Sequence, residues 1–312
     1  MPPIKRWFPD TPVTLNLSND PQEMRGTRNA RERAELLSSV SRVYAISNWV
    51  RDRFLDGLPA DAEANRVVAI NSPVRPCEHL VPKEKLILFV RRIVPAKGAL
   101  LFAQAMRALL PAFPEWKAQM IGGVWHGREG DSDYSRAVAQ EFAGLGSQGA
   151  ITGYVPVSEV RNAMARASIL CVPSLWNEPF GRVAVEGAAE GALVATTGRG
   201  GLREAAGNVG LFIDSEDPGV WAERLRPWVL DNAGLQAAAA AGRRHAEQFA
   251  TYRIAARLDQ ARGSARQGTF PRERPDTDSR EVLRSCRMSR THQTHADRTN
   301  HRFCTPRATL PG

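Results

Sequence analysis

The sequence predicts an α/β protein built on parallel sheets. Short apolar, β-rich segments alternate along the chain with segments of helical periodicity. The strand candidates of the second half are continuous apolar runs, which is typical of strands buried on both faces of a sheet. A chain of 312 residues is long enough for roughly two such domains. Ligands of open α/β sheets bind beyond the carboxyl ends of the strands, so residues that follow predicted strands are the first functional candidates.

The clearest alternation of strand and helix lies between residues 84 and 262. Strands are expected at Leu86–Val90, Ala118–Ile121, Ile151–Thr152, Ser168–Val172 and Leu193–Ala195. Helices are expected over Leu100–Leu110, over Val183–Ala189 and, rich in Ala and Arg, from Pro218 to Gln260. This order of elements predicts a doubly wound sheet with crossover helices.

The first 75 residues carry a shorter version of the same pattern. Strand candidates lie at Val13–Leu17, Arg42–Ile46 and Arg66–Ile70, with a helix between the first two. Three strands make about half of a Rossmann-like sheet, so we expect earlier strands of this domain to be missing. The two prolines of Asn71–Pro76 mark a linker. The predicted domains are therefore 1–75 and 76–262.

The last fifty residues, 263–312, are predicted to be disordered. They are rich in Arg, Ser, Thr, His and Pro and lack apolar periodicity. Ten arginines against five acidic residues place +5 of the net charge of +9 here, so the remainder of the chain is only mildly basic. This segment contains no lysine and no interleaved aromatic residues. We therefore expect an extension without function, and no nucleic-acid partner.

Compartment and metal content follow from what the sequence lacks. It has no run of about 18 apolar residues and no apolar leader, which favours the cytoplasm. The cysteines Cys77, Cys171, Cys286 and Cys304 show no metal-type spacing and are interpreted as free thiols. Asp131-Ser132-Asp133 has the form of a D-x-D metal site, but it begins a helical pattern, so Asp131 or Ser132 is expected to cap a helix. We predict no metal and no cofactor.

Two cations follow the first strand of the second domain. Arg92 and Lys97 stand five residues apart, beyond a strand and before a helix N-terminus, where unpaired N–H groups favour an anion. Arginine can bind phosphate oxygens bidentately and lysine supplies a mobile point charge. The pair predicts a diphosphate site, although two solvated cations framing a turn would give the same pattern.

Two carboxylates follow the strand Ser168–Val172. Pro179 fits a helix entrance, which places Glu178 just outside the helix and Glu186 one to two turns inside. Carboxylates so placed can accept hydrogen bonds from hexose and ribose hydroxyls, while the N–H groups of Phe180 and Gly181 face a diphosphate. The alternative is that both acids only stabilise the helix.

At this point the residues resemble a known family. Glu178-Pro-Phe-Gly-Arg-Val-Ala-Val-Glu186 resembles the E-x7-E motif of glycosyltransferase family 4 (group 1, retaining, GT-B fold), and Pro173-Ser174 and Gly200-Gly-Leu-Arg-Glu204 are similar to its P-S and G-G-x-x-E elements. Arg92 and Lys97 are similar to its G-R-x4-K-G element, with Arg91 where glycine is common. Thr152–Val155 is similar to the loop that holds the nucleotide base. Departures are Leu193 for a usual proline and Ser18 for a usual histidine.

The resemblance implies a GT-B fold of two Rossmann-like domains, the first incomplete, and a retaining transfer of a hexose. It implies a UDP- or GDP-sugar donor and a glycan or lipid-linked acceptor, in polysaccharide biosynthesis, with a peripheral contact to the inner membrane face. Arg92, Lys97 and Glu178 take the catalytic roles. The remaining donor-binding residues are Tyr154 and Val155 for the base, Glu186 for the ribose, and Asn177, Phe180, Gly181 and Arg182.

Other functions stay open at this stage. A partial first domain would suit a nucleotide-sugar-binding remnant without activity. The basic segment 263–312 would suit a nucleic-acid-binding module, whose binding would fall steeply with salt. GT-B epimerases and hydrolases are further alternatives.

Overall fold

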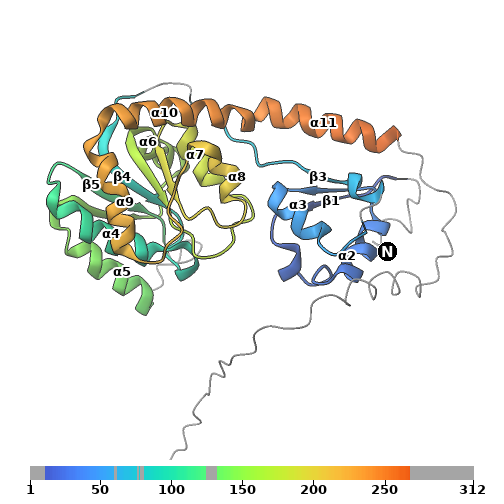
Figure 1. The fold of residues 1–312 in the computed structure, drawn as a ribbon, viewed down its shortest axis with the longest axis horizontal. Coiled ribbons are helices and arrows are strands. Elements are labelled where there is room, and N and C mark those ends of the chain that lie inside the picture. The colour runs from blue at the N-terminus through green and yellow to red at the C-terminus, as the bar shows by residue number, and fades with distance from the viewer. Residues whose placement is uncertain (1–10, 60–61, 76, 78–80, 124–131, 268–312) are drawn as a thin grey trace, which may run out of the picture. The chain divides into compact units, whose positions relative to one another are not determined.

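The computed structural model describes residues 11–59, 62–75, 77, 81–123 and 132–267. Within them lie two parallel sheets, one of three strands and one of six, with helices around each (Figure 1). The predicted α/β class with parallel sheets is confirmed. Helix α11, Thr251–Gln267, continues past residue 262, where the tail was predicted to begin. The rest of that segment lies outside the described residues.

The first sheet contains the three strands predicted for the N-terminal part of the chain. It runs in the order β1-β2-β3, where β1 is Thr14–Leu17, β2 is Arg42–Ala45 and β3 is Val67–Ala69. Helix α2, Ala30–Ser39, connects the first two strands, and α3, Asn48–Leu55, follows the second. Leu17, Leu37, Val43, Val50 and Phe54 form the centre of a core between this sheet and its helices.

Both helices of this part begin at side-chain caps. The Asn29 side chain accepts a hydrogen bond from the backbone N–H of Glu32 at the start of α2, at 2.9 Å. The Glu32 carboxylate in turn accepts from the N–H of Arg28, at 2.8 Å. The Ser47 hydroxyl oxygen caps α3 by accepting from the N–H of Val50, at 3.0 Å. These caps satisfy N–H groups that the first helical turn leaves without partners.

The second sheet has the strand order β6-β5-β4-β7-β8-β9, and every neighbouring pair is parallel. Its strands are β4 Glu84–Val90, β5 Lys117–Ile121, β6 Gly149–Gly153, β7 Ala167–Val172, β8 Leu193–Thr196 and β9 Leu211–Phe212. The chain starts near the middle and winds outward in both directions. The direction of winding reverses between the paired strands β4 and β7, and ligands of such sheets bind beyond the carboxyl ends of the strands at this switch point.

Strand β4 shows why these strands read as continuous apolar runs. Ile87 and Phe89 face one core, whereas Leu86 and Leu88 face the other, because successive side chains of a strand point to opposite faces. Helices cover both sides of the sheet (Figure 1). One face packs against α4 (Ala99–Leu109), α5 (Asp133–Ala143) and α9 (Pro218–Leu230), and the other against α6 (Val157–Arg166), α7 (Arg182–Ala189) and α8 (Leu202–Ala206).

The C-terminal helices return to the linker. After α10, Asn232–Ala246, the backbone N–H of Val74 donates to the carbonyl oxygen of Phe249, at 2.9 Å. From α11, Arg257 donates through Nη1 to the Asn71 side chain, at 3.2 Å, and through Nη2 to the carbonyl oxygen of Ala69, at 3.0 Å. The predicted linker is therefore held by contacts from the end of the chain.

Two predicted helix starts have different outcomes. Ser132 caps α5 by accepting from the N–H of Ser135, as expected, whereas Asp131 lies outside the described residues. The placement of Pro179 at a helix entrance is wrong. Helix α7 begins at Arg182, after Gly181, and Pro179 lies in the preceding loop. Backbone contacts with residues 200 and 201, described below, hold that loop out of the helix.

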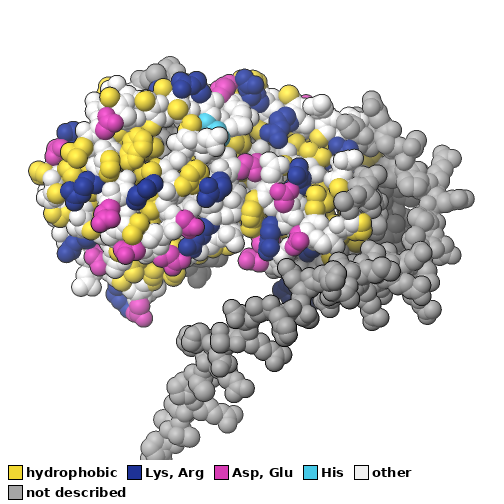
Figure 2. Space-filling view, in the orientation of Figure 1, with side chains coloured by type: hydrophobic (Ala, Val, Ile, Leu, Met, Phe, Trp, Pro, Cys, Tyr) yellow, Lys and Arg dark blue, Asp and Glu magenta, His cyan; other side chains and the backbone are white. Residues whose placement is uncertain are grey.

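The surface charge is relevant to nucleic-acid binding, and the length of the helices is relevant to membrane spanning. Basic and acidic side chains are interspersed over the face shown in Figure 2, with no extended block of one sign. Within the described ranges, no helix is both long and apolar enough to cross a membrane.

Candidate functional site

A cavity of about 570 Å³ lies beyond the carboxyl ends of the central strands. Its charged lining residues are the cations Arg91, Arg92, Lys97 and Arg182 and the carboxylates Glu178 and Glu186. Phe180 and Gly181 also line it, together with Ser18, Asn19 and Ile46 from the ends of the first sheet. The cavity therefore lies where the strand order predicts a ligand site, and cations exceed carboxylates in its wall.

Glu178 is the centre of the polar network in this cavity. Its Oε1 accepts three hydrogen bonds, from Nη1 of Arg91 at 2.6 Å, Nζ of Lys97 at 2.7 Å and Oγ of Ser174 at 2.5 Å. The side chain of Glu178 is only 6% exposed, and those of Arg91 and Lys97 are 11% and 9% exposed. Lys97 also lies over the ring of Trp176, with Nζ 4.5 Å from its centroid. A buried carboxylate so surrounded has one fixed orientation.

Burial and the neighbouring charges shift the pKa values of the ionisable groups in this network. Burial alone would raise the pKa of Glu178, but Arg91 and Lys97 outweigh it and hold that pKa below its usual value. Burial lowers the pKa of Lys97, and Glu178 opposes that shift. Burial also raises the pKa of Glu186, although Arg182 pairs with it at 2.8 Å. Glu178 is therefore ionised at neutral pH and is neutralised by its own cations.

The loop after β4 and the loop after β7 touch each other. The N–H of Leu175 donates to the carbonyl oxygen of Ala96, at 3.0 Å. Gly98 has φ 71°, and a Cβ there would lie 2.9 Å from the carbonyl carbon of Pro173. Only glycine fits this conformation and this close approach. The contact brings Lys97 to Glu178 across the two loops.

The loop after β8 holds the segment around Glu178 from the other side. Gly200 forms a parallel bridge with Glu178, and the N–H of Gly201 donates to the carbonyl oxygen of Glu178, at 2.7 Å. A Cβ on Gly201 would lie 2.8 Å from Cα of Phe180, so the two backbones pack directly. These contacts keep Pro179 and Phe180 in a loop rather than in α7.

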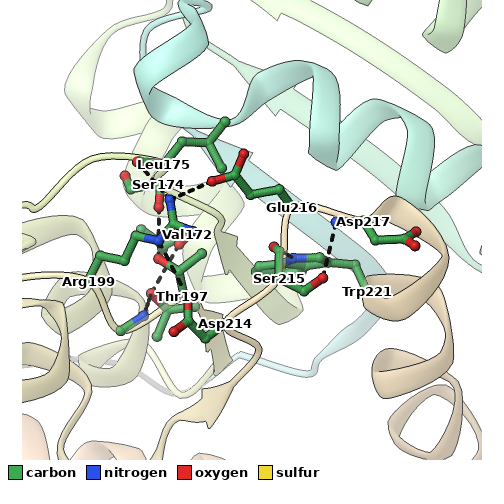
Figure 3. Close-up of polar contacts among 12 residues, drawn as sticks. Val172, Ser174, Leu175, Thr197, Arg199, Asp214, Ser215, Glu216, Asp217 and Trp221 are labelled. Carbon is green, nitrogen blue, oxygen red and sulfur yellow. Dashed lines mark hydrogen bonds and ion pairs between the residues drawn. The ribbon is translucent and has the colours of Figure 1, made fainter. Parts of the chain in front are cut away.

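Side chains of the same loop bind the start of the β7 loop, as Figure 3 shows. Thr197 donates from Oγ1 to the carbonyl oxygen of Ser174, at 2.8 Å, and Arg199 donates from Nη1 to that of Leu175, at 2.8 Å. Arg199 is itself paired with Glu216, at 2.9 Å, and with Asp214, at 3.4 Å. The backbone that carries Glu178 is thus held by hydrogen bonds from the loop after β8.

The start of α3 contacts this segment as well. The Ser47 hydroxyl donates to the carbonyl oxygen of Pro179. Glu204 accepts from the backbone N–H of Asn48, at 2.7 Å, and from the side chain of Asn71, at 2.8 Å. The G-G-x-x-E element therefore does two things here, since its glycines pack on the loop of Glu178 and its glutamate binds the N-terminal part of the chain.

The structure brings most of the predicted site residues together. Arg92, Lys97, Glu178, Phe180, Gly181, Arg182 and Glu186 all line the cavity. Asn177 is exposed and does not line it. Tyr154 is 51% exposed, and Val155 lines a separate cavity of about 290 Å³ with Gln119 and Thr152. The base-binding role of Tyr154 and Val155 stays a prediction.

Two contributors were missed from sequence. Arg91 was noted only as a departure from a pattern, yet it makes the shortest ion pair to Glu178. Trp176 was assigned no role, yet its ring lies against Lys97. Arg91 follows β4 directly, and Trp176 lies between Ser174 and Glu178. These positions could have indicated from the sequence that both residues belong to the site. Within the described ranges no three His, Cys, Asp or Glu side chains form a group that could hold a metal. The absence of a metal from the reaction stays a prediction.

Residues 75–245 match the family model described as "Glycosyl transferases group 1". The protein YtcC of Bacillus subtilis (strain 168) is 24% identical over 274 residues, which cover 81% of this chain and 67% of YtcC. The D-inositol 3-phosphate glycosyltransferase of Nocardioides sp. (strain ATCC BAA-499 / JS614) is 31% identical over 206 residues, which cover 58% of this chain. The chain spans only 44% of that relative's length.

Solved structures share the fold. Anabaena Alr3699/HepE in complex with UDP and glucose superposes with a TM-score of 0.68 at 19% identity, over 84% of this chain and 74% of that one. Sucrose-phosphate synthase (tll1590) from Thermosynechococcus elongatus gives 0.64 at 20% identity, over 80% of this chain and 67% of that one. This likeness confirms the GT-B fold.

Proposed function

Because the chain belongs to the glycosyl transferases group 1 family, we propose that it transfers a hexose from a nucleoside diphosphate sugar to an acceptor hydroxyl, with retention of anomeric configuration. The observation that carries this proposal is the buried contact of Lys97 with Glu178 in the wall of the cavity. This contact supports a sugar bound through a diphosphate, because a cation can bind phosphate oxygens and a neighbouring carboxylate can accept hydrogen bonds from sugar hydroxyls.

The charges of the cavity suit such a donor. Four cationic and two anionic side chains line it, which leaves an excess of positive charge. A nucleoside diphosphate sugar carries two negative charges on its diphosphate and would balance that excess. A diphosphate also gains charge as it departs, so cations already in place stabilise the transition state more than the bound donor.

The residues act in the following way in this proposal. Arg92 and Lys97 bind the diphosphate, Glu178 accepts hydrogen bonds from hydroxyls of the hexose, and Glu186 accepts them from the ribose. The bond between the anomeric carbon and the diphosphate oxygen breaks as the acceptor oxygen bonds to the same face of that carbon. The acceptor proton passes to the departing diphosphate. No protein nucleophile is required.

The donor and acceptor are narrower proposals. HepE was solved with UDP-glucose, which makes UDP-hexoses the first donors to test. A glycan or lipid-linked acceptor is proposed from the family resemblance alone. The chain spans less than half of the D-inositol 3-phosphate glycosyltransferases it matches, so its activity as a whole is part of the proposal.

Titration calorimetry with UDP-glucose and a GDP-hexose, paired with an assay of donor hydrolysis and transfer, tests this function. Arg92→Ala and Lys97→Ala should each weaken donor binding or lower kcat by about tenfold or more, since each removes a charge-assisted bond. Lys85→Ala is the matched control, because Lys85 at the start of β4 pairs with Glu115 at 3.2 Å, is 58% exposed and lines neither cavity. Unchanged binding and rate in both site variants would refute the assignment. Donor binding by the wild type without turnover would favour a remnant that only binds nucleotide sugars.

A further inference from the structure

We propose that Ser174 is a positioning residue for the donor sugar. Its hydroxyl holds Oε1 of Glu178 and thereby leaves Oε2 as the oxygen that accepts a hydrogen bond from a hydroxyl of the hexose. This inference rests on the proposed function, because it specifies how Glu178 meets the sugar. Ser174 does not line the cavity, so it acts on a ligand only through Glu178.

The two carboxylate oxygens of Glu178 have different surroundings. Oε1 accepts from Nη1 of Arg91 at 2.6 Å, Nζ of Lys97 at 2.7 Å and Oγ of Ser174 at 2.5 Å. Oε2 accepts no hydrogen bond from the residues that the structure describes, and it is not fully buried. Because Glu178 lines the cavity, Oε2 is the oxygen through which it meets a ligand there.

The hydroxyl of Ser174 is committed to this one contact. Ser174 is fully buried two residues after β7, and its carbonyl oxygen accepts from Oγ1 of Thr197, at 2.8 Å. A hydroxyl donates a single hydrogen, and that of Ser174 goes to Oε1 of Glu178. A hydrogen bond from a hydroxyl to a carboxylate is short and about twice as strong as one between neutral groups. Ser174 is therefore a fixed point against which the carboxylate is oriented.

The third donor matters because two cations do not by themselves leave an oxygen free. A carboxylate accepts hydrogen bonds at both oxygens, and its pair with an arginine frequently uses both. Arg91 and Lys97 instead both bind Oε1, beside the hydroxyl of Ser174. Turning the carboxylate so that each oxygen bound one cation would break the bond to Ser174. Without that hydroxyl, Glu178 could turn in this way, and Oε2 would be lost to the sugar.

The chemistry of Oε2 selects the group that binds there. An ionised carboxylate oxygen accepts hydrogen bonds and donates none, so it binds a hydroxyl and repels a phosphate oxygen. The diphosphate is left to cations of the cavity, among them Arg92 and Lys97. A nucleoside diphosphate without its sugar has no hexose hydroxyl. Loss of the Ser174 hydroxyl should therefore weaken the binding of a nucleotide sugar and leave that of the nucleoside diphosphate unchanged.

Calorimetric titration with UDP-glucose and with UDP, and in parallel with GDP-mannose and GDP, tests the proposal. The ratio of the two affinities in a pair measures the contribution of the hexose. In Ser174→Ala this ratio should fall by about tenfold, because a charge-assisted hydrogen bond to the hexose is lost, and kcat for hydrolysis of the nucleotide sugar should fall with it. Ser174→Cys keeps a weaker donor of similar size and should give an intermediate ratio.

Ser168→Ala is the matched control. It also removes a buried hydroxyl close to one end of β7, where Ser168 donates to the carbonyl oxygen of Glu84 at 2.6 Å, but it lines neither cavity. The ratio should stay at the wild-type value in this variant. A general loss of stability does not imitate the expected result, because it affects both ligands of a pair alike.

The outcomes separate this inference from the proposed function. A ratio that stays at the wild-type value in Ser174→Ala, while Glu178→Gln lowers it, would overturn the role of Ser174 alone. Equal affinities of the wild type for nucleotide and nucleotide sugar in both pairs would overturn the hexose contact of Glu178 and this inference with it. A wild-type protein that binds neither pair would overturn the proposed function as well. If Ser174→Ala does not fold by circular dichroism, Ser174→Cys decides, and an unchanged ratio there refutes the inference.

Discussion

Replacing Glu178 by glutamine should lower the free energy of unfolding by about 3 kcal/mol. Glutamine keeps the shape of the side chain but removes the charge that neutralises Arg91 and Lys97, which donate at 2.6 and 2.7 Å. Removing one charge from a buried ion pair costs about 3–5 kcal/mol, and the amide oxygen of glutamine can still accept a hydrogen bond from a charged donor, so we expect a cost near the lower end of that range. The two cations left without a partner charge are each only about 10% exposed, so water replaces the lost charge poorly.

Thermal unfolding measures this effect. For a unit of this size, about 3 kcal/mol corresponds to a fall in Tm of roughly 6–12 °C. Glu84→Gln is the matched control, since Glu84 also pairs with an arginine at 2.9 Å but both side chains are about half exposed. Exposed pairs contribute about 0–1 kcal/mol, so its Tm should change little. A fall in Tm for Glu178→Gln no larger than that for Glu84→Gln would show that the buried network does not stabilise the fold.

Two further predictions concern acid and the glycines. The pKa of Glu178 is lower folded than unfolded, so its contribution to stability is present above about pH 4.3, the usual carboxyl value, and is lost as the pH falls through the folded pKa. The stability difference between wild type and Glu178→Gln should therefore shrink below about pH 4, and a constant difference in urea unfolding would contradict this. Gly201→Ala should weaken donor binding and lower Tm, since its Cβ would lie 2.8 Å from Cα of Phe180. Gly263→Ala in α11 is the control, because a Cβ at residue 263 would meet no atom of another element within 4 Å, and its Tm should stay unchanged or rise. Equal effects of the two substitutions on Tm would refute the packing argument.

The second sheet was predicted well because a strand buried on both faces is apolar at consecutive positions, and such a run can be recognised in the sequence. Leu86, Ile87, Leu88 and Phe89 face two different cores, so all four must be apolar, and the run is visible without a structure. The start of α7 was misplaced for a tertiary reason. Pro179 suits a first helical turn. However, Gly201, more than twenty residues further along the chain, donates its backbone N–H to the carbonyl oxygen of Glu178, and this contact holds the loop out of the helix. Local preference is overridden there by a contact that the local sequence does not contain.

The candidate site was predicted in part for a similar reason. Spacing after a strand showed that Arg92 and Lys97 lie at the carboxyl edge of the sheet, and the structure places both in the cavity wall. It could not show that Arg91, one residue earlier, bonds to Glu178, because that contact depends on how the chain leaves β4. Tyr154 and Val155 follow a strand at the same edge but do not line that cavity. The position of a residue at the carboxyl edge of the sheet predicts which side chains lie near one another, but it does not predict which of them are in contact.

The contact of Gly98 with Pro173 also limits how this protein can be altered. The β4 and β7 loops carry opposite charges, and they meet where no side chain fits between their backbones. An insertion in either loop would change the separation of Lys97 from Glu178, even if it left every charged residue in place. A chimera that borrowed one loop from a relative should therefore lose the ion pair, whereas one that borrowed both together would keep it. For recombination, the two loops form a single exchangeable part, although about eighty residues separate Lys97 from Glu178 along the chain.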